Sequence, residues 1–388
     1  MDSNLEIKKI VPVEKCSSCG ACFNACSHSA ISFQLDKEGF YRPIVDKEKC
    51  IKCGLCERRC PWVHVVTNPN GADVSPRTIA AYANDEKIRM QSSSGGSFTI
   101  MAESILDQDG VVVGVAQQEK DCFKHIVVDS KDNLDLLRGA KYVQANVGLI
   151  YQNVRALLKE KRKVLFSGTP CQIAALYSFL GNTVYSNLYT LDIVCHGVPS
   201  VNVFKKYVHE LECLKKSNLN RTIFRDKTTG WTGYSLKHEF ESGKILYIRN
   251  PQSAYLRLFV NKICLNSSCE DCHYRKLPRI ADITLGDYWG VNRFHPEMDD
   301  DRGTSVILLN NSHGESLFNS IKERLIWCES NISNAIAFNP NIAVSRKEHP
   351  KREMFFKNLG KYSLNALAKK YCSKPSLLSR ILFRMKKI

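Results

Sequence analysis

Cysteine is the residue type that carries most of the chemistry in this sequence. The chain has 17 cysteines in 388 residues, and eight of them form two runs with the spacing C-x2-C-x2-C-x3-C. The first run is Cys16, Cys19, Cys22 and Cys26, and the second is Cys50, Cys53, Cys56 and Cys60. A cuboidal iron–sulfur cluster needs three closely spaced thiolates and a fourth from elsewhere. The repeated run therefore predicts two 4Fe-4S clusters.

The spacing also predicts which cysteines share a cluster. In two-cluster proteins of this kind the last cysteine of each run binds the other cluster. We therefore expect one cluster on Cys16, Cys19, Cys22 and Cys60, and the other on Cys50, Cys53, Cys56 and Cys26. Zinc is the alternative for paired C-x2-C sequences, but zinc sites usually leave a gap after two cysteines, whereas these runs carry four each. Ser27 stands where the second run has Pro61, which makes the first loop less regular.

Short elements must position these loops. Residues 30–33 and 41–45 flank the turn residues 36–39 and predict a hairpin between the runs. Residues 67–73 are rich in turn formers and end this unit. Beyond them, helical patterns alternate with β-type stretches at residues 79–83, 111–116, 125–128, 164–167 and 188–194. The predicted fold is an α+β ferredoxin-like two-cluster domain followed by an α/β body with a mixed, partly parallel sheet.

Two glycine-containing turns in the body could approach a phosphate-bearing cofactor. Ser94, Gly95 and Gly96 precede an apolar helical stretch, and Gly168, Thr169 and Gln172 follow a predicted strand with Pro170 placed to open a helix. A plain helix N-cap explains either turn equally well. Neither G-x-G-x-x-G nor G-x4-G-K-[ST] occurs in the sequence.

Other cysteines suggest a third metal site. Cys195 follows a predicted strand, and Cys269 and Cys272 form another C-x2-C pair that His273 follows. The pair with its histidine fits c-type haem attachment, but that process normally follows export, and the N-terminal residues show no apolar secretory signal. A further metal site is the better interpretation, although the spacing does not reveal its other ligands.

Several longer motifs together resemble one known family. They occupy residues 92–96, 137–144, 166–176, 192–200, 224–227, 230–231 and 282–290. These ordered motifs are similar to those of the coenzyme F420 hydrogenase/dehydrogenase beta-subunit family, in which an N-terminal ferredoxin unit is common. The resemblance divides the chain into a two-cluster domain (1–67), N-terminal-type (78–163) and C-terminal-type (164–350) beta-subunit domains and a basic helical tail (351–388).

The resemblance implies an iron–sulfur flavoprotein with FAD and a third 4Fe-4S cluster in its body. The third cluster would be held by Cys171, Cys195, Cys269 and Cys272, with Cys264 competing for one place. The flavin would be surrounded by Ser94, Gly95, Gly96, Lys141, Gly168, Thr169 and Gln172. His196 is the candidate catalytic proton donor, and its alternative role is a backbone-bonded histidine that shapes the turn before Pro199.

The expected function is an oxidoreductase that passes electrons between a ferredoxin-like carrier and an organic substrate. Membership of this family does not fix the substrate; a small molecule or glycan precursor in polysaccharide biosynthesis is the leading hypothesis. The alternatives are an electron-relay subunit of a larger complex, an iron–sulfur scaffold without flavin and a zinc-stabilised interaction protein. Clusters pass single electrons, whereas a flavin exchanges two.

The chain is basic, with 55 Lys and Arg against 39 Asp and Glu and a net charge of +16. Bound clusters and FAD would offset about half of this charge. A basic amphipathic helix is predicted after Ser373, which could lie on an anionic membrane surface, dock a partner or pack on its own domain. No nucleic-acid motif accompanies the charge, so an acidic electron carrier is the expected partner. The expected location is the cytoplasm, including the inner membrane surface.

Overall fold

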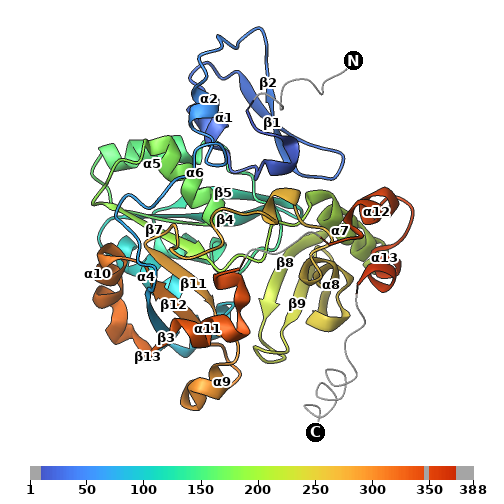
Figure 1. The fold of residues 1–388 in the computed structure, drawn as a ribbon. Coiled ribbons are helices and arrows are strands. Elements are labelled where there is room, and N and C mark those ends of the chain that lie inside the picture. Colours follow the sequence, from blue (N-terminus) through green and yellow to red (C-terminus); the bar gives the residue numbers. More distant parts are fainter. Residues whose placement is uncertain (1–9, 345–348, 373–388) are drawn as a thin grey trace.

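The computed structural model describes residues 10–344 and 349–372, which form a small N-terminal unit seated on a larger body (Figure 1). The unit contains helices α1 (Ala21–Ala25) and α2 (Leu55–Arg58) and strands β1 (Ile31–Leu35) and β2 (Tyr41–Val45). The strands pair antiparallel, with Ile31 opposite Val45. The predicted hairpin between the two cysteine runs is confirmed.

An eight-stranded sheet with the order β13-β3-β12-β11-β7-β6-β4-β5 forms the centre of the body. Its strands are β3 (Arg77–Ala83), β4 (Val111–Glu119), β5 (Cys122–Val128), β6 (Val164–Gly168), β7 (Leu188–Ile193), β11 (Ile283–Asp287), β12 (Ser305–Leu309) and β13 (Leu325–Ser330). The pairs β4–β6, β6–β7 and β7–β11 are parallel, and the other pairs are antiparallel. The predicted mixed, partly parallel sheet is confirmed.

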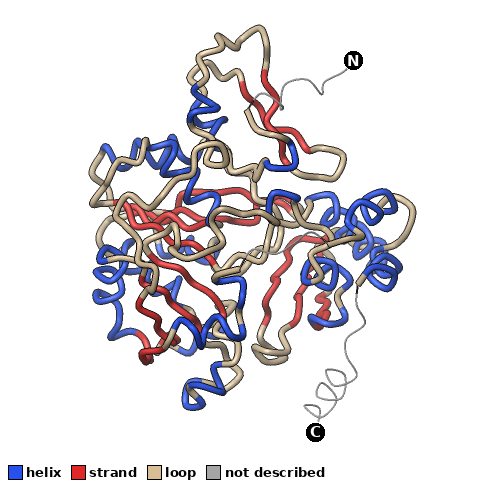
Figure 2. Tube along the Cα trace, viewed as in Figure 1, coloured by secondary structure: helices blue, strands red, loops and turns tan. Residues whose placement is uncertain are grey.

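Helices cover both faces of this sheet and lie on the outside of the strands (Figure 2). One face packs on α4 (Ser97–Leu106) and α10 (Ser312–Ile321). The other packs on α5 (Ile150–Lys159) and α6 (Pro170–Leu180), and Ala21 of α1 joins that core. In α5 the apolar face formed by Ile150, Val154 and Leu158, which are spaced four residues apart, is buried. The N-terminal unit therefore rests directly on the α5 and α6 layer.

A second sheet, β10-β9-β8, was not predicted from the sequence. Its antiparallel strands are β8 (Leu219–Asp226), β9 (Ser235–Phe240) and β10 (Ile245–Arg249), and its core includes side chains of α7 (Val201–Lys215), α8 (Ala254–Val260), α12 (Arg352–Asn358) and α13 (Leu364–Tyr371). The remaining helices are α3 (Glu86–Gln91), α9 (Val291–Phe294) and α11 (Ile332–Phe338). The start of the predicted C-terminal tail thus packs into the body, whereas the basic helix expected after Ser373 lies outside the described residues.

The N-terminal unit is fixed to the body by hydrogen bonds to backbone atoms. Asn266 of the body donates through Nδ2 to the carbonyl of Cys16 at 3.1 Å, and its Oδ1 accepts from Arg42 Nη2 of the N-terminal unit at 3.2 Å. Gly20 has φ +82° and lies so close to Val147 that a Cβ atom there would be 3.1 Å from the valine Cβ. Within the described ranges, no helix is long and apolar enough to cross a membrane.

One buried ion pair fixes the end of β7 near Cys195. Arg279 Nη2 lies 2.8 Å from Asp192 Oδ2, and both side chains are fully buried. Arg279 also donates to the Ile342 carbonyl at 3.3 Å. The pair therefore joins the centre of the sheet to two later segments of the chain.

We expect Arg279→Met to lower the free energy of unfolding by about 3–5 kcal/mol, because it leaves the Asp192 carboxylate buried without its partner. The exposed Arg293 offers a matched control, and Arg293→Met should change stability by less than about 0.5 kcal/mol. Anaerobic urea unfolding followed by circular dichroism measures both. Equal stability of the two variants would show that the pair does not support the sheet.

Candidate functional site

The structure brings the last cysteine of each N-terminal run next to the other run. Burial, with a smaller contribution from the thiols of Cys60 and Cys16, raises the pKa of Cys19 to about 12. Burial also raises the pKa of Cys56, and the neighbouring thiols that add to this effect are Cys50 and Cys26. The crossed arrangement expected from the spacing is therefore present in the geometry, and the ligand roles themselves stay a prediction.

A third group of thiols forms where the N-terminal unit meets the body. Its members are Cys171 in the first turn of α6, Cys195 after β7, and Cys269 and Cys272. Burial raises the pKa of Cys171 well above its usual range, and Cys272, Cys19 and Cys195 add to the shift. Cys269 has its pKa raised to about 12 by burial and by Cys195. The four cysteines named by the resemblance thus lie together.

Cys264 does not belong to this third group. It is fully buried in the core of the second sheet, where burial and the thiol of Cys372 raise its pKa. Cys269 of the Cys269–Cys272 pair lies next to Cys195. The ring of His273, which would ligate a c-type haem, instead lies 4.3 Å from the ring of Trp62. The geometry thus favours a shared thiol site over c-type haem attachment.

The spacing of the sulfur atoms discriminates between a cluster and a single zinc ion. In a tetrahedral thiolate site with Zn–S of about 2.3 Å, neighbouring sulfurs are about 3.8 Å apart. Across the described ranges, just one trio of His, Cys or acidic ligand atoms lies within 4.8 Å, and it contains none of these twelve cysteines. Among the described residues, no three of these thiols therefore lie as close together as the ligands of a single zinc ion.

Tyr151 of α5 connects the N-terminal thiols to the third group. Its hydroxyl is 2.7 Å from the carbonyl of Cys19 and 3.2 Å from that of Gln172. Burial raises the pKa of Tyr151, and the nearby thiols of Cys19 and Cys171 contribute to the shift. The neutral phenol therefore stays a hydrogen-bond donor that fixes the two loops relative to each other.

A cavity of about 610 Å³ lies beside the third thiol group. Cys171 and Cys195 form part of its wall. The predicted flavin residues that line it are Ser94, Gly96, Lys141, Gly168, Thr169 and Gln172, and His196 lines it as well. The volume lies within the range of roughly 300–1,000 Å³ that is typical of cofactor sites.

Gly95 is the exception among the predicted flavin residues, because it faces the sheet and does not line the cavity. Its N–H donates to Ser305 Oγ at 3.0 Å, and a Cβ atom at this position would lie 2.4 Å from the carbonyl oxygen of Ala81. A glycine is therefore required for the close approach of this loop to the sheet.

Both glycine turns are helix caps as well as cavity walls. Gln172 Oε1 accepts a hydrogen bond from the Thr169 N–H at 2.9 Å, which forms the capping box of α6. Gly96, with φ +92°, precedes α4. A side-chain cap is thus present at the second turn, whereas Gly96 caps α4 without a side-chain hydrogen bond and Ser94 Oγ donates to the carbonyl of Thr304. Both turns remain available to line a cofactor site.

Two positively charged side chains have unusual surroundings here. Lys141 Nζ donates to the carbonyls of Leu137 and Arg138 at 2.7 and 2.9 Å, and burial, with a contribution from Arg221, lowers its pKa to about 7. Burial likewise lowers the pKa of Lys227 to about 7. Lys227 is not among the cavity-lining residues, and its Nζ donates to the carbonyls of Ser94 and Arg302 at 2.8 and 2.6 Å. Lys141 lines the cavity, where a bound anion would favour its charged form.

His196 has the backbone contact that its alternative role requires. Its Nε2 lies 3.2 Å from the carbonyl oxygen of Phe259, and its ring is 4.9 Å from the phenyl ring of Phe259. The imidazole also lies on the cavity wall. The geometry is therefore compatible with both roles considered for this residue.

A buried ion pair that also lines the cavity was not singled out from the sequence. Arg225 Nη1 lies 2.8 Å from Asp287 Oδ2, and the guanidinium lies over the rings of Tyr234 and Trp289. Trp289 stacks on Trp231 with ring centroids 4.7 Å apart. Arg225 and Asp287 both lie within the motifs that carry the family resemblance, which was the one signal available for them.

Comparison with family models agrees with this architecture. A 4Fe-4S dicluster domain matches residues 15–63. For the beta subunit of coenzyme F420 hydrogenase/dehydrogenase, the N-terminal model matches residues 78–150 and the C-terminal model matches residues 161–334. The chain belongs to the coenzyme F420 hydrogenase/dehydrogenase beta-subunit family. This beta-subunit family member is an iron–sulfur redox protein. Its membership of a hydrogenase/dehydrogenase family agrees with the predicted oxidoreductase activity.

A solved structure also matches the beta-subunit family member. It is a xenon-derivatized structure of the F420-reducing [NiFe] hydrogenase complex from Methanosarcina barkeri. The matched chain has 17% sequence identity to this chain, and the TM-score of the comparison is 0.46. The match covers 79% of this chain and 94% of that chain. No curated protein matches the sequence.

The lowered pKa of Lys141 predicts how stability depends on pH. Between about pH 7 and the ordinary lysine pKa near 10.4, the unfolded chain binds more protons at this site than the folded protein. The free energy of unfolding should therefore rise with pH in that window, by less than about 1.4 kcal/mol per pH unit. Lys141→Met should remove this rise.

Anaerobic urea unfolding of the flavin-free proteins at pH 7, 8 and 9 measures the difference between wild type and Lys141→Met, because a bound phosphate would favour the charged amine. Lys159→Met, at an exposed position of α5, is the control and should follow the wild type at each pH. Parallel curves for Lys141→Met and wild type would contradict the buried position of this amine.

Proposed function

We propose that this protein is an iron–sulfur flavoprotein oxidoreductase with three 4Fe-4S clusters and FAD. Electrons would pass between a ferredoxin-like carrier and an organic substrate. The main support for this proposal is the position of Cys171. This residue neighbours Cys19 of the N-terminal unit and also lines the large cavity. A cluster at this position would connect the ferredoxin unit to a cofactor in the cavity.

The charges around the third thiol group support a metal cluster there. Burial raises the pKa of Cys195 and Cys272, whereas the guanidinium groups of Arg275 and Arg279 act in the opposite direction on both thiols. Metal ligation requires thiolates, so nearby guanidinium groups favour the ligating form. Cys171, Cys195, Cys269 and Cys272 would be the four ligands of this cluster.

The cavity fits a flavin nucleotide in size and in the groups that it presents. Hydroxyl and backbone groups of Ser94, Gly96, Gly168 and Thr169 would face its polar parts, and Lys141 would gain charge beside its phosphates. A bound flavin supplies the exchange between one-electron and two-electron chemistry. His196 lies on the wall, where it would donate a proton to the substrate.

The remaining wall suits a polar organic substrate. Trp289 presents an aromatic ring beside the Arg225–Asp287 pair, a combination that can stack on a substrate and orient its polar groups. A glycan precursor has suitable chemistry, and polysaccharide biosynthesis is the process that we propose for it.

The exposed end of the N-terminal unit is the proposed donor side. Cys53 is exposed, and Lys52 and Arg58 lie exposed beside it. Such a surface attracts an acidic electron carrier or partner subunit. The matching family is one of beta subunits, so an electron-relay subunit is the second candidate function. We place the protein in the cytoplasm, with peripheral contact at the inner membrane surface through the C-terminal segment.

The iron content of two cysteine variants tests the third cluster. The wild-type protein, purified anaerobically, should contain about twelve irons and one FAD, and Cys171→Ala should retain about eight irons. Cys264→Ala is the control, since Cys264 lies in the apolar core. Its iron content should equal that of the wild type. Equal iron in both variants, or zinc in place of iron in the wild type, would contradict the proposal.

The proton-donor role of His196 can be separated from electron transfer. His196→Gln should lower quinone reduction on the order of 100-fold, because quinone reduction consumes protons. Reduction of ferricyanide, which needs no proton, should be unchanged, as should the iron and flavin content. If both acceptors react at the wild-type rate, His196 serves only to shape its turn.

A further inference from the structure

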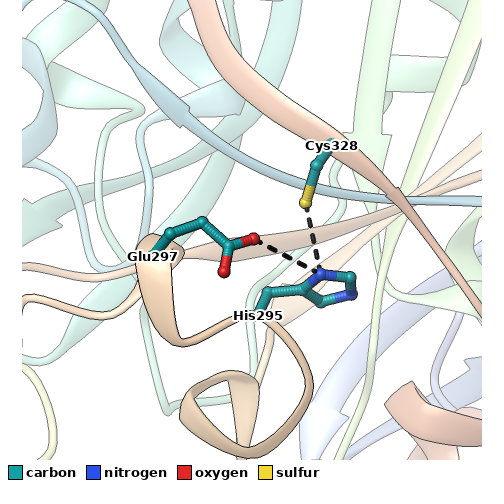
Figure 3. Close-up of side chains that lie close together, drawn as sticks. All are labelled: His295, Glu297 and Cys328. Atoms are coloured by element: carbon teal, nitrogen blue, oxygen red, sulfur yellow. Dashed lines mark hydrogen bonds and ion pairs between the residues drawn. The ribbon is translucent and has the colours of Figure 1, made fainter.

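Another group of potential metal ligands, apart from the three groups of thiols, lies at the edge of the eight-stranded sheet. It consists of His295, Glu297 and Cys328 (Figure 3). This is the trio, among the residues that the structure describes, whose ligand atoms all lie within 4.8 Å of one another. We propose that these three residues bind a zinc ion that is separate from the iron–sulfur clusters.

The distances match those around a tetrahedral zinc ion. His295 Nδ1 lies 3.5 Å from Cys328 Sγ and 3.7 Å from Glu297 Oε1. Bond lengths of about 2.3 Å to sulfur and about 2.0–2.1 Å to nitrogen and oxygen place tetrahedral ligands about 3.6 Å apart for N and S and about 3.4 Å apart for N and O. Small shifts of the Glu297 side chain would close the remaining difference.

Strand β13 holds the imidazole from both sides of its ring. Cys328 and Ser330 are two residues apart on this strand, so their side chains share one face. Ser330 Oγ lies 2.8 Å from His295 Nε2, and the Tyr288 hydroxyl also bonds to Ser330. A hydrogen bond from Nε2–H to Ser330 would leave the lone pair of Nδ1 directed at Cys328 and Glu297.

The donor set suits zinc and differs from the thiol groups described above. One thiolate, one imidazole and one carboxylate form a mixed site of the kind that zinc accepts. The side chain of Glu297 is 64% exposed, so solvent can reach the site and water can complete the coordination. A zinc ion at this site would need no iron–sulfur cluster.

A zinc ion at this position would join two segments that are distant in the sequence. His295 and Glu297 follow β11 and the cavity residues Asp287 and Trp289, whereas Cys328 lies on the edge strand β13. The ion would therefore brace one wall of the cavity against the edge of the sheet. Its expected role is structural, because the three ligands do not line the cavity.

The test uses the cluster-loaded full-length protein. Zinc and iron are quantified after equilibration with a chromophoric zinc chelator, for wild type and for His295→Gln, Glu297→Gln and Cys328→Ser. Wild type should bind about one zinc more than His295→Gln or Cys328→Ser, and Glu297→Gln should bind zinc at least tenfold more weakly. Iron content should be the same in all four proteins.

Cys213→Ser is the matched control, because Cys213 Sγ lies 3.7 Å from His209 Nε2 but belongs to no ligand trio in the described part of the chain. It should bind zinc like the wild type. Zinc-edge X-ray absorption should show one sulfur at about 2.3 Å together with nitrogen and oxygen at about 2.0–2.1 Å.

Two results would overturn the proposal. The first is equal zinc binding by wild type and all three ligand variants, which would leave the trio as an ordinary hydrogen-bonded group. The second is a zinc environment of sulfur alone, which would place the metal in the cysteine groups. Glu297 is exposed, so its variant keeps the test independent of folding defects.

Discussion

Thiol groups are buried where the N-terminal unit meets the body, and their burial is a constraint on how the two parts can be joined. A thiolate is costly in a poorly hydrated environment, and burial raises the pKa of Cys19 and Cys269 to about 12. Without a compensating positive charge these groups would stay protonated at neutral pH. Burial raises the pKa of Cys195 as well, and the nearby Arg275 opposes this shift; a metal–sulfur core would supply the larger compensation.

This constraint explains why the two units are joined so firmly. Asn266, three residues before Cys269, donates to the carbonyl of Cys16 and accepts a hydrogen bond from Arg42 of the N-terminal unit. On the other side Tyr274, two residues after Cys272, donates to the carbonyl of Pro61 at 2.6 Å. Loops that carry cysteines of different groups are therefore fixed to one another through backbone atoms. Electron transfer between the groups would need such a fixed separation.

The parts of the fold that sequence reasoning predicted are those with a strong local signal. The cysteine runs, the hairpin between them, the apolar face of α5 and the strands from β3 to β7 all follow from short-range patterns. Strands β8 to β10 were missed, because exposed positions interrupt the apolar residues of β8 and β10 and polar residues interrupt those of β9. These strands share a core with α7 and α8, and such packing decides their state. Likewise, spacing could not decide between Cys264 and its competitors, since the difference is their tertiary position.

The residues around the cavity could likewise be predicted only in part from the sequence. Six of the seven residues expected to surround a flavin line it, and Gly95 instead packs against the sheet, which no local pattern could reveal. The pairing of Arg225 with Asp287 joins strands of two different sheets, so its partners are 62 residues apart in sequence. The sequence pattern locates such residues, whereas the contact between them depends on the assembled fold.

We propose that Cys171 links the N-terminal clusters to a flavin in the cavity. The most direct test mixes reduced ferredoxin with the FAD-loaded protein in a stopped-flow instrument and follows cluster and flavin absorbance. We predict that in wild type the flavin is reduced after the clusters. In Cys171→Ala the N-terminal clusters should be reduced while the flavin stays oxidised. Flavin reduction at the wild-type rate in that variant would show that Cys171 does not connect the N-terminal clusters to the flavin.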